Sequence, residues 1–174
     1  MFNFKKELRG KTVLVTGADG FLGSHLTEKL VSFGAKVHAY VRATSSGELK
    51  NIGHLRSKIT VHRGNLGDKH SVELALKEVK KSKDRPFIFH LAAQAHVGES
   101  WDRPYETFES NVLATLNLLQ SIVDVGLKIE KLDTAGTSEE YGNINECMKD
   151  YHDFDKKGNV IFHERSPINP KSIY

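Results

Sequence analysis

The chain contains 174 residues, of which 39% are hydrophobic and 27% are charged, and its formal net charge is +3. These proportions are those of an ordinary globular protein, and the length is enough for one domain with a sizeable core. The sequence has no uninterrupted apolar run of about 18 residues, which excludes a membrane-spanning helix. Its single cysteine, Cys147, excludes an internal disulfide.

Charge and residue spacing exclude several kinds of partner. The basic residues are scattered, and the densest group, from Lys77 to Lys83, is interleaved with acidic side chains. We therefore expect no nucleic-acid binding, which requires a broad basic patch. The histidines have no metal-ligand spacing, so no metal is expected. The segment from Met1 to Lys6 lacks the apolar stretch of a signal peptide, and we expect a cytoplasmic protein without membrane contact.

Short apolar runs alternate along the chain with segments of helical period. Runs rich in β-branched and aromatic residues predict strands. They cover Thr12–Thr16, Lys36–Val41, Ile59–His62, Pro86–Leu91 and Ile129–Thr134. Strands that alternate with helices imply right-handed crossovers. The sequence therefore predicts an α/β protein with a doubly wound parallel sheet, covered by helices on both faces.

Longer periodic segments predict the helices. Phe21–Phe33 has apolar residues at helical spacing, and Gly34 after it suits a left-handed C-cap. Asp68 is placed to cap the start of a second helix. A third helix, Tyr105–Val125, is closed by Gly126 and gathers apolar residues on one face. These residues are Phe108, Val112, Leu116, Leu119 and Val123.

A glycine-rich turn joins the first strand to the first helix. Gly17 permits a tight turn, Gly20 lets the backbone approach a phosphate oxygen, and Gly23 lets the helix pack closely. The helix begins at Phe21 and Leu22, where free N–H groups and the helix dipole favour an anion. The turn therefore predicts a pyrophosphate site for a dinucleotide, and a turn without a ligand is the alternative.

The glycine spacing is Gly-x-x-Gly-x-x-Gly rather than the Gly-x-Gly-x-x-Gly of the commonest dinucleotide fingerprint. It resembles the extended branch of the short-chain dehydrogenase/reductase superfamily, which contains nucleotide-sugar epimerases and dehydratases. The resemblance covers the whole chain and implies a Rossmann-like sheet, truncated before the substrate domain. It implies a dinucleotide-binding domain at residues 1–142 and, at 143–174, a loop leading to the helix of a catalytic tyrosine.

The end of the second strand bears on the choice of cofactor. NAD enzymes usually place an acidic residue there to hold the ribose hydroxyls, whereas this chain has Val41 followed by Arg42. A guanidinium suits the 2′-phosphate of NADP, and Thr44 and Ser45 are further donors. The stretch resembles that of the GDP-mannose 4,6-dehydratases, which implies NADP. NAD as the cofactor, with Arg42 as a surface residue, is the alternative.

Two further motifs resemble cofactor contacts of the family. Asn65 and Leu66 follow the third strand, where the family contacts adenine and usually has Asp at the position of Asn65. The matching residues after the fourth strand are Leu91, Ala92, Ala93 and Gln94. Small residues there let the backbone approach the cofactor. We interpret His90 as a packing residue at the strand end, and the motif around Asn111 as structural.

Two segments resemble the catalytic motifs of the family. Thr137 and Glu139 follow the fifth strand, and Tyr174 matches the tyrosine of the family's Tyr-x-x-x-Lys motif. The resemblance implies that Thr137 orients the C4 hydroxyl of a nucleotide sugar. It implies that Tyr174, beside the cofactor, accepts the proton of that hydroxyl. Tyrosine is a weak base at neutral pH, and a nearby lysine ammonium favours the phenolate.

Glu139 bears on the type of reaction. Once C4 is a ketone, the proton on C5 is acidic, and a carboxylate can remove it while the C6 hydroxyl leaves as water. Return of the hydride to C6 completes a 4,6-dehydratase reaction, which the resemblance favours. A 4-epimerase needs no such base. Related epimerases and decarboxylases also have this glutamate, so they remain an alternative, as does Glu139 as a simple turn cap.

The motif lysine would fall four residues after Tyr174, beyond the last residue. We therefore expect an N-terminal fragment that binds cofactor without turnover. A non-catalytic NADP-binding module is the other hypothesis, although the catalytic residues favour the enzyme. The resemblance implies a homodimer or higher homo-oligomer through Tyr105–Val125. Trp101 and Arg103 are in a segment that lies near the sugar in dehydratases, but surface packing explains them equally well.

Overall fold

The computed structural model describes residues 4–142 and 153–174. The chain divides into two compact units. Unit 1 consists of Met1–Gln94 and Glu109–Ala135, and unit 2 consists of Ala95–Phe108 and Gly136–Tyr174. The domain boundary expected after residue 142 stays a prediction. Of the loop expected at 143–174, residues 143–152 lie outside the described residues.

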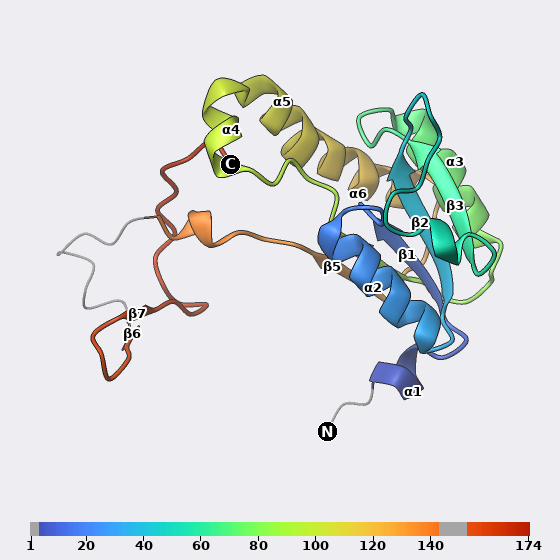
Figure 1. The fold of residues 1–174 in the computed structure, drawn as a ribbon, viewed down its shortest axis with the longest axis horizontal. Helices are drawn as coiled ribbons and strands as arrows, with labels where there is room; N and C mark the ends of the chain where they lie inside the picture. The colour runs from blue at the N-terminus through green and yellow to red at the C-terminus, as the bar shows by residue number, and fades with distance from the viewer. Residues whose placement is uncertain (1–3, 143–152) are drawn as a thin grey trace. The chain divides into compact units, whose positions relative to one another are not determined.

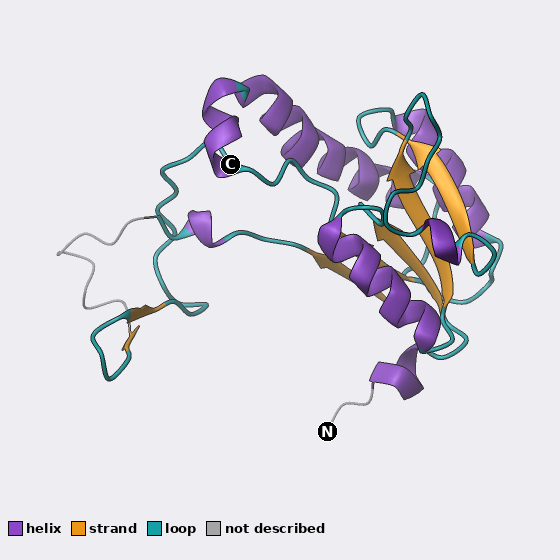
Figure 2. Cartoon of the chain, in the orientation of Figure 1, coloured by secondary structure: helices purple, strands orange, loops and turns teal. Residues whose placement is uncertain are grey.

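Unit 1 is built on a parallel sheet with the strand order β3-β2-β1-β4-β5 (Figure 2). The strands are β1 (Thr12–Thr16), β2 (Lys36–Arg42), β3 (Ile59–Gly64), β4 (Phe87–His90) and β5 (Lys131–Thr134). β1 lies at the centre and pairs with both β2 and β4, so the order of strands reverses direction beside it. This confirms the doubly wound parallel sheet that the alternation of strands and helices predicted.

Helices of unit 1 cover both faces of this sheet (Figure 1). The short α1 (Phe4–Leu8) and α2 (Phe21–Ser32) pack on one face. α3 (Lys69–Lys80) and α6 (Ala114–Asp124) pack on the other face. A short 3-10 helix, η1 (Gly53–Leu55), lies between β2 and β3. Strands that are covered on both faces have near-continuous apolar sequences, as β1 does.

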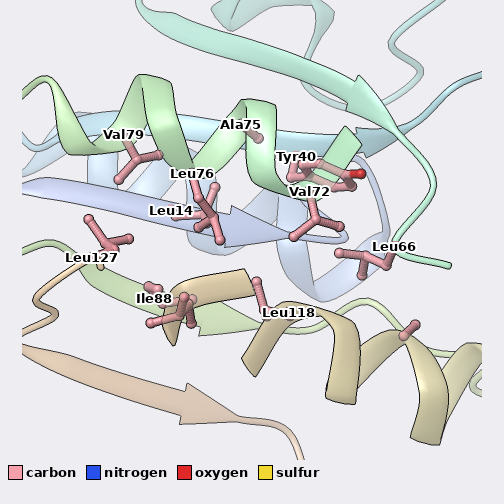
Figure 3. Packing of buried hydrophobic residues seen from close by; sticks show 12 residues of the cluster. Leu14, Tyr40, Leu66, Val72, Ala75, Leu76, Val79, Ile88, Leu118 and Leu127 are labelled. Carbon is pink, nitrogen blue, oxygen red and sulfur yellow. The ribbon is translucent and has the colours of Figure 1, made fainter. Parts of the chain in front are cut away.

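Alternate residues of the central strand supply two separate cores. Val13 and Val15 of β1 pack with Leu30 of α2 on one face. Leu14 points to the other face and packs with Leu76 of α3, as Figure 3 shows. Side chains of a strand alternate between the two faces of a sheet, so a single apolar strand can serve both cores.

The caps of the first two predicted helices form as expected. The Asp68 carboxylate accepts a hydrogen bond from the backbone N–H of His70 at 3.0 Å and caps α3. Gly34 follows α2 with a φ of +79°, the left-handed conformation of a glycine C-cap. These local signals therefore place both helix ends correctly.

The prediction of one helix over Tyr105–Val125 is wrong in detail. The chain forms α5 (Pro104–Phe108), a π-helical segment η2 (Glu109–Leu113) and then α6. A π turn holds more residues than an α turn, so it rotates the residues that follow around the helix axis. The apolar spacing of the sequence predicts a helical segment but not the π turn within it.

The apolar face predicted on this helix is not the face that packs against the sheet. α6 buries Ala114, Leu118 and Ile122 instead. Leu116 is 55% exposed and Val123 is 71% exposed. The core takes one apolar face of α6 and leaves a second apolar face at the surface of unit 1.

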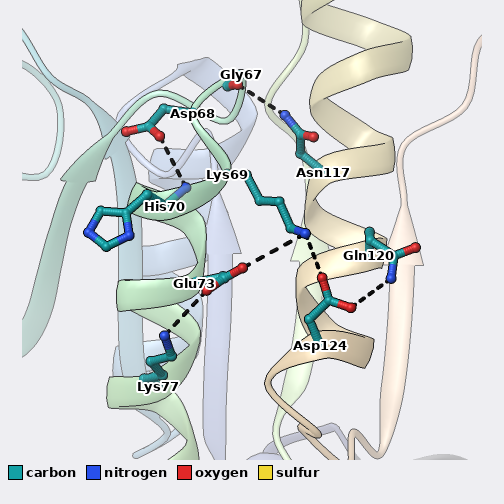
Figure 4. A network of polar contacts seen from close by, with 9 residues as sticks. All are labelled: Gly67, Asp68, Lys69, His70, Glu73, Lys77, Asn117, Gln120 and Asp124. Carbon is teal, nitrogen blue, oxygen red and sulfur yellow. Dashed lines mark hydrogen bonds and ion pairs between the residues drawn. The ribbon is translucent and has the colours of Figure 1, made fainter.

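Polar contacts hold α6 against α3 beside the apolar contact (Figure 4). The ammonium of Lys69 on α3 lies 2.6 Å from the carboxylate of Asp124 on α6. The side chain of Asn117 donates to the backbone oxygens of Leu66 at 3.0 Å and Gly67 at 3.1 Å. These contacts tie α6 to the loop that follows β3.

The described residues of unit 2 form only short elements. They are α4 (Val97–Asp102), α5, η3 (Ser138–Glu140), β6 (Asp153–Phe154) and β7 (Val160–Ile161). β6 and β7 form an antiparallel hairpin, closed by Gly158 with a φ of +80°. The Asp155 carboxylate accepts hydrogen bonds from the backbone N–H groups of Lys157 and Asn159, each at 2.8 Å. These contacts form the turn at Lys157–Asn159 that joins the two strands.

Candidate functional site

The carboxyl ends of β1 and β4 meet where the strand order reverses, which is where ligands bind in sheets of this kind. Gly17 follows β1 with a φ of +67°. A Cβ atom on Gly17 would lie 2.9 Å from the backbone nitrogen of Ala92, which follows β4. Only glycine permits so close an approach in this conformation. The fold thus brings together the glycine turn and the segment Leu91–Gln94.

The glycine turn folds back on the start of α2. Gly20 donates its N–H to the carbonyl oxygen of Gly17 at 2.9 Å, and a Cβ atom on Gly23 would overlap that same oxygen. Within the described residues, no side chain caps this helix end, and its first turn has no acidic residue. Phe21 and Leu22 are exposed. The backbone N–H groups here suit an anion, as the sequence predicts.

Asp19 ties the glycine turn to the loop after β2. Its carboxylate accepts backbone N–H groups from Lys50 at 2.9 Å, Asn51 at 2.8 Å and Ile52 at 3.1 Å. The Asn51 side chain donates to the Asp19 carbonyl oxygen at 2.6 Å. These three backbone N–H groups hold the Asp19 carboxylate, whose negative charge would otherwise repel an anion bound at the glycine turn. No local pattern indicates this role of Asp19, because its partners lie more than 30 positions away.

Arg42 is the last residue of β2, and its side chain is exposed. In the part of the chain that the structure describes, the guanidinium has no ion pair or hydrogen bond. Val41 before it is buried in the core, so no acidic side chain stands where NAD enzymes bind ribose hydroxyls. Thr44 and Ser45 follow in an exposed segment. The end of β2 therefore offers a cation and two hydroxyls.

Asn65 and Leu66 take part in the fold itself. Asn65 is exposed, and its side-chain oxygen accepts the N–H of Gly67 at 3.0 Å. The side chain of Leu66 is buried in the core beside α3 and α6. Only the backbone of Leu66 is therefore suited to a cofactor contact. The adenine contacts expected of both residues stay predictions.

His90 lies in the middle of a buried chain of hydrogen bonds. Its Nδ1 atom is 2.7 Å from the Thr16 hydroxyl, and its Nε2 atom is 2.9 Å from the Thr115 hydroxyl. The Thr16 oxygen also accepts the backbone N–H groups of Leu91 and Ala92, so its proton is left for Nδ1. Thr115 donates to a backbone carbonyl, so it accepts from Nε2–H. Burial lowers the pKa of His90, which favours the neutral ring.

The segment after β4 is held from both ends. His90 and Thr16 fix Leu91 and Ala92, as described above. Asn111 fixes Gln94, whose N–H donates to the Asn111 side-chain oxygen at 2.8 Å and whose carbonyl accepts from the Asn111 amide at 3.1 Å. The structural roles predicted for His90 and the Asn111 motif agree with these contacts. A rigid backbone between them suits a segment that positions a cofactor.

Thr137 caps the short helix that carries Glu139. The Thr137 hydroxyl oxygen accepts the backbone N–H of Glu139 at 3.2 Å. The hydroxyl proton has no acceptor among the described residues, so it remains available to a ligand. Both side chains are half-buried. The local turn thus presents one hydroxyl donor and one carboxylate two residues apart.

A pocket of about 200 Å³ lies within unit 2, and Glu139 and Ser138 form part of its wall. Trp101 of α4 and Lys171 line the same pocket. Trp101 could not be assigned to a site from the sequence, because a lone aromatic residue carries no signal that separates a pocket wall from surface packing. Arg103, between α4 and α5, forms ion pairs with Glu99 of α4 and Glu106 of α5 and does not line the pocket.

Tyr174 is half-buried and follows an irregular segment. Its role and those of Thr137 and Glu139 stay predictions. The Tyr141 ring of the same unit stacks on Phe162 at a centroid distance of 4.7 Å. No group of three or more potential metal ligands occurs within residues 4–142 and 153–174. No helix in the same ranges is long and apolar enough to cross a bilayer.

The reversal in strand order and the glycine turn define the class of Rossmann-like dinucleotide-binding proteins. A model of the GDP-mannose 4,6 dehydratase family matches residues 14–174. The chain belongs to this family, within the extended epimerases and dehydratases of the short-chain dehydrogenase/reductase superfamily.

Individual proteins agree with this assignment. GDP-mannose 4,6-dehydratase of Vibrio cholerae is 32% identical over 172 residues, which cover 94% of this chain and 43% of that protein. UDP-glucose 4-epimerase of Thermus thermophilus, in complex with NAD, superimposes with a TM-score of 0.71 at 34% identity, over 94% of this chain and 46% of that one. The enzyme of Thermotoga maritima with UDP-glucose has a TM-score of 0.72 at 28% identity, with coverages of 94% and 46%. The chain spans less than half the length of these proteins.

Proposed function

We propose that this chain supplies the cofactor-binding sheet and the catalytic turn of a nucleotide-sugar 4,6-dehydratase. The observation that carries the proposal is Glu139, a carboxylate in a pocket wall, two residues after the threonine that caps its turn. Removal of a C5 proton from a 4-keto sugar requires a base beside the sugar ring. A 4-epimerase requires none, because its 4-keto sugar only has to rotate.

Each side chain has a distinct task in this proposal. Thr137 donates its free hydroxyl proton to the C4 oxygen and orients it. Tyr174 accepts the proton of the C4 hydroxyl. Glu139 removes the C5 proton, and the C6 hydroxyl leaves as water. A nicotinamide dinucleotide, when bound, supplies reversible storage of a hydride.

The residues present fit such a cofactor. A Cβ atom at position 17 or 23 would meet backbone atoms, so the turn keeps open a cradle of backbone that only glycine allows. Phe21 and Leu22 begin the helix whose N–H groups would hold the pyrophosphate. Arg42 would hold a 2′-phosphate, and we therefore propose NADP rather than NAD.

The test uses protein produced from the complete gene, incubated with GDP-mannose and NADP. A 4,6-dehydratase gives a product lighter by one water, and deuterium placed at C4 of the sugar appears at C6. A product of unchanged mass identifies an epimerase instead. Loss of carbon dioxide from a nucleotide-linked sugar acid identifies a decarboxylase. Mass spectrometry separates these outcomes.

Glu139→Gln is the decisive variant, with the exposed Glu164→Gln as its matched control. We expect Glu139→Gln to slow loss of water by about 10²–10⁴-fold, the usual effect of removing a general base. Binding of the cofactor should not change. Equal rates of water loss for the two variants would show that Glu139 is not the base and has only a structural role in the turn.

A non-catalytic cofactor-binding module is the second candidate, and the complete absence of turnover with retained NADP binding would favour it. The 174-residue chain itself is expected to bind cofactor without turnover. The cytoplasmic location stays a prediction.

We also propose that the protein forms a homo-oligomer through α6. Its exposed apolar face includes Leu116, Leu119 and Val123. A contiguous apolar face of this kind is uncommon on a monomer and suits a symmetric contact with a second copy.

A further inference from the structure

Asp19 lies inside the glycine turn, between Gly17 and Gly20. The backbone N–H groups of this turn suit an anion, whereas a carboxylate beside them repels one. For a pyrophosphate site, the charge of Asp19 is therefore unfavourable by itself. The contacts of its side chain indicate what Asp19 contributes instead.

The half-buried side chain of Asp19 holds a second segment of the chain. It accepts hydrogen bonds from three consecutive backbone N–H groups, those of Lys50, Asn51 and Ile52, at 2.8–3.1 Å. The Asn51 side chain donates back to the Asp19 carbonyl oxygen at 2.6 Å. Hydrogen bonds to an ionised acceptor are stronger than those between neutral groups. One residue of the glycine turn thus fixes the far end of the loop after β2.

This loop has two anchored ends and an exposed middle. At its start, the N–H of Ala43 donates to the carbonyl oxygen of Gly64 at 3.2 Å. At its end, Ile52 is fully buried in the core and bonded to Asp19. Among the described residues, the hydrogen bonds of Thr44–Glu48 stay within the loop. The position of this middle stretch relative to the glycine turn therefore depends on Asp19.

The groups proposed for the cofactor phosphate lie at this loop. Arg42 ends β2 directly before it, and Thr44 and Ser45 belong to its exposed middle. A loop that becomes ordered only when a ligand binds loses conformational freedom, and this loss weakens the binding. A loop that is already held in place avoids that loss.

We propose that Asp19 is a positioning residue for the cofactor, which fixes the loop Ala43–Leu49 against the glycine turn so that the loop receives the 2′-phosphate of NADP. The inference rests on the proposed function for the presence of a nicotinamide dinucleotide. Asp19 itself does not contact the cofactor and acts through the backbone of Lys50–Ile52. Removal of this negative charge from an anion site therefore weakens the binding of the anion.

Substitution of Asp19 has opposite effects under the two roles that its carboxylate can have. If it acts only as a charge, Asp19→Ala and Asp19→Asn both bind NADP more tightly, because the repulsion is gone. If it positions the loop, Asp19→Ala binds NADP about tenfold more weakly. Asp19→Asn should lose less affinity, because one oxygen of the wild-type carboxylate, Oδ1, accepts two of the three N–H groups and the amide oxygen replaces it. Isothermal titration of protein from the complete gene measures the affinities.

The ligand that loses affinity identifies the segment through which Asp19 acts. We expect Asp19→Ala to weaken NADP more than NAD, because NAD lacks the 2′-phosphate. Adenosine 2′,5′-bisphosphate, a probe with this phosphate but no nicotinamide, should weaken about as much as NADP. An equal loss for NADP and NAD would place the effect in the glycine turn and overturn the role of the loop.

Hydrogen exchange tests the positioning without any ligand. The amides of Lys50, Asn51 and Ile52 should be protected in wild type and should exchange at least about tenfold faster in Asp19→Ala. The amides of β1 should exchange as in wild type. Unchanged exchange of the three loop amides would overturn the proposal.

Asp84→Asn is the matched control. Asp84 accepts the backbone N–H of Thr12 at 2.8 Å and the Thr12 hydroxyl at 2.7 Å. Thr12 begins β1, so this carboxylate lies at the opposite end of the strand from the glycine turn. We expect Asp84→Asn to leave the three affinities and the exchange of the loop amides unchanged. A matching loss in Asp84→Asn would show a general effect of weakened folding.

The wild-type titration separates the possible failures. Wild-type protein that binds neither NADP nor NAD contradicts the proposed function and, with it, the role of Asp19. Wild-type protein that binds NADP while both Asp19 variants bind it as well or more tightly overturns the role of Asp19 alone.

Discussion

The Thr16 hydroxyl lies 2.7 Å from Nδ1 of His90, across two neighbouring strands whose ends carry the two predicted cofactor segments. Thr16 is the residue before the glycine turn, and His90 is the residue before Leu91. The same Thr16 oxygen accepts N–H groups from Leu91 and Ala92. This one side-chain contact therefore couples the glycine turn to the backbone opposite it.

The first prediction concerns the pH dependence of His90. Burial lowers the pKa of His90, so folding favours its neutral form. Its contribution to stability is complete above the pKa of an unfolded histidine, about 6.5, and is lost as the pH falls from there toward the folded-state value. Urea unfolding of wild type should therefore give a lower free energy at about pH 5 than at about pH 7.5.

His90→Gln isolates this contribution from other titrating groups. Glutamine keeps a donor but loses the acceptor for Thr16, so we expect a loss of about 1–3 kcal/mol at neutral pH. The difference between wild type and variant should shrink as the pH falls. An equal difference at both pH values would refute the neutral, buried histidine.

The second prediction concerns His38 and His62 on β2 and β3. Nδ1 of His38 lies 2.9 Å from Nε2 of His62. Burial, followed by the charge of His62, lowers the pKa of His38 to about 4, while Glu78 and Asp84 act in the opposite direction. The pair therefore stabilises the fold above about pH 6.5, and this contribution is lost as the pH falls toward 4.

NMR titration of the imidazole C–H signals measures this shift. The His38 signal, assigned by its loss in His38→Gln, should titrate far below the usual histidine range of about 6.5. Titration within that range would mean that the two rings are open to water.

The third prediction concerns Gly23. A Cβ atom there would overlap the Gly17 carbonyl oxygen, so Gly23→Ala must displace the start of α2. We expect a loss of about 1–3 kcal/mol in stability and at least tenfold weaker cofactor binding. Gly53→Ala is the matched control, because its Cβ would meet its nearest neighbour at 3.9 Å. Isothermal titration with NADP measures the affinities, and equal values for both variants would contradict the predicted phosphate turn.

The fourth prediction concerns the choice between NADP and NAD. Arg42→Ala removes an exposed guanidinium that has no partner within the described residues, so the fold should be unaffected. We expect NADP to bind about 10–100-fold more weakly and NAD to bind as before, the effect of one or two charge-assisted hydrogen bonds. Arg9→Ala, before the amino end of β1, is the control. An equal loss of affinity for NADP and NAD would show that Arg42 does not bind the 2′-phosphate.

The fifth prediction concerns the exposed face of α6. Leu119→Glu places a charge on that face while Leu118, which is buried, keeps the core intact. We expect the variant to be a monomer under conditions where wild type forms a homo-oligomer, because a buried unpaired charge opposes the contact. Light scattering after size-exclusion chromatography measures the mass. Leu74→Glu, on the exposed side of α3, is the control, and an unchanged mass for Leu119→Glu would direct the search to another surface.

Local patterns determined most of unit 1. The apolar alternation that makes Leu14 face one core and Val13 the other is visible in the chain itself, and so are the Asp68 and Gly34 caps. These signals act over a few residues, because backbone conformation and the direction of a side chain are set locally. Strands that alternate with helices then permit few topologies, so the doubly wound sheet could be predicted as well.

Only the tertiary structure decided which residues meet. α6 has two apolar faces, and the core took the face of Leu118 and Ile122 rather than the predicted one, a choice that periodicity along the chain could not indicate. Asp19 accepts hydrogen bonds from the loop after β2, about 30 positions further along the chain. Trp101 and Lys171 line one pocket together with Glu139, although they lie far apart in the sequence. Contacts between positions far apart depend on how packed elements position the backbone, and the spacing of residues along the chain does not contain that information.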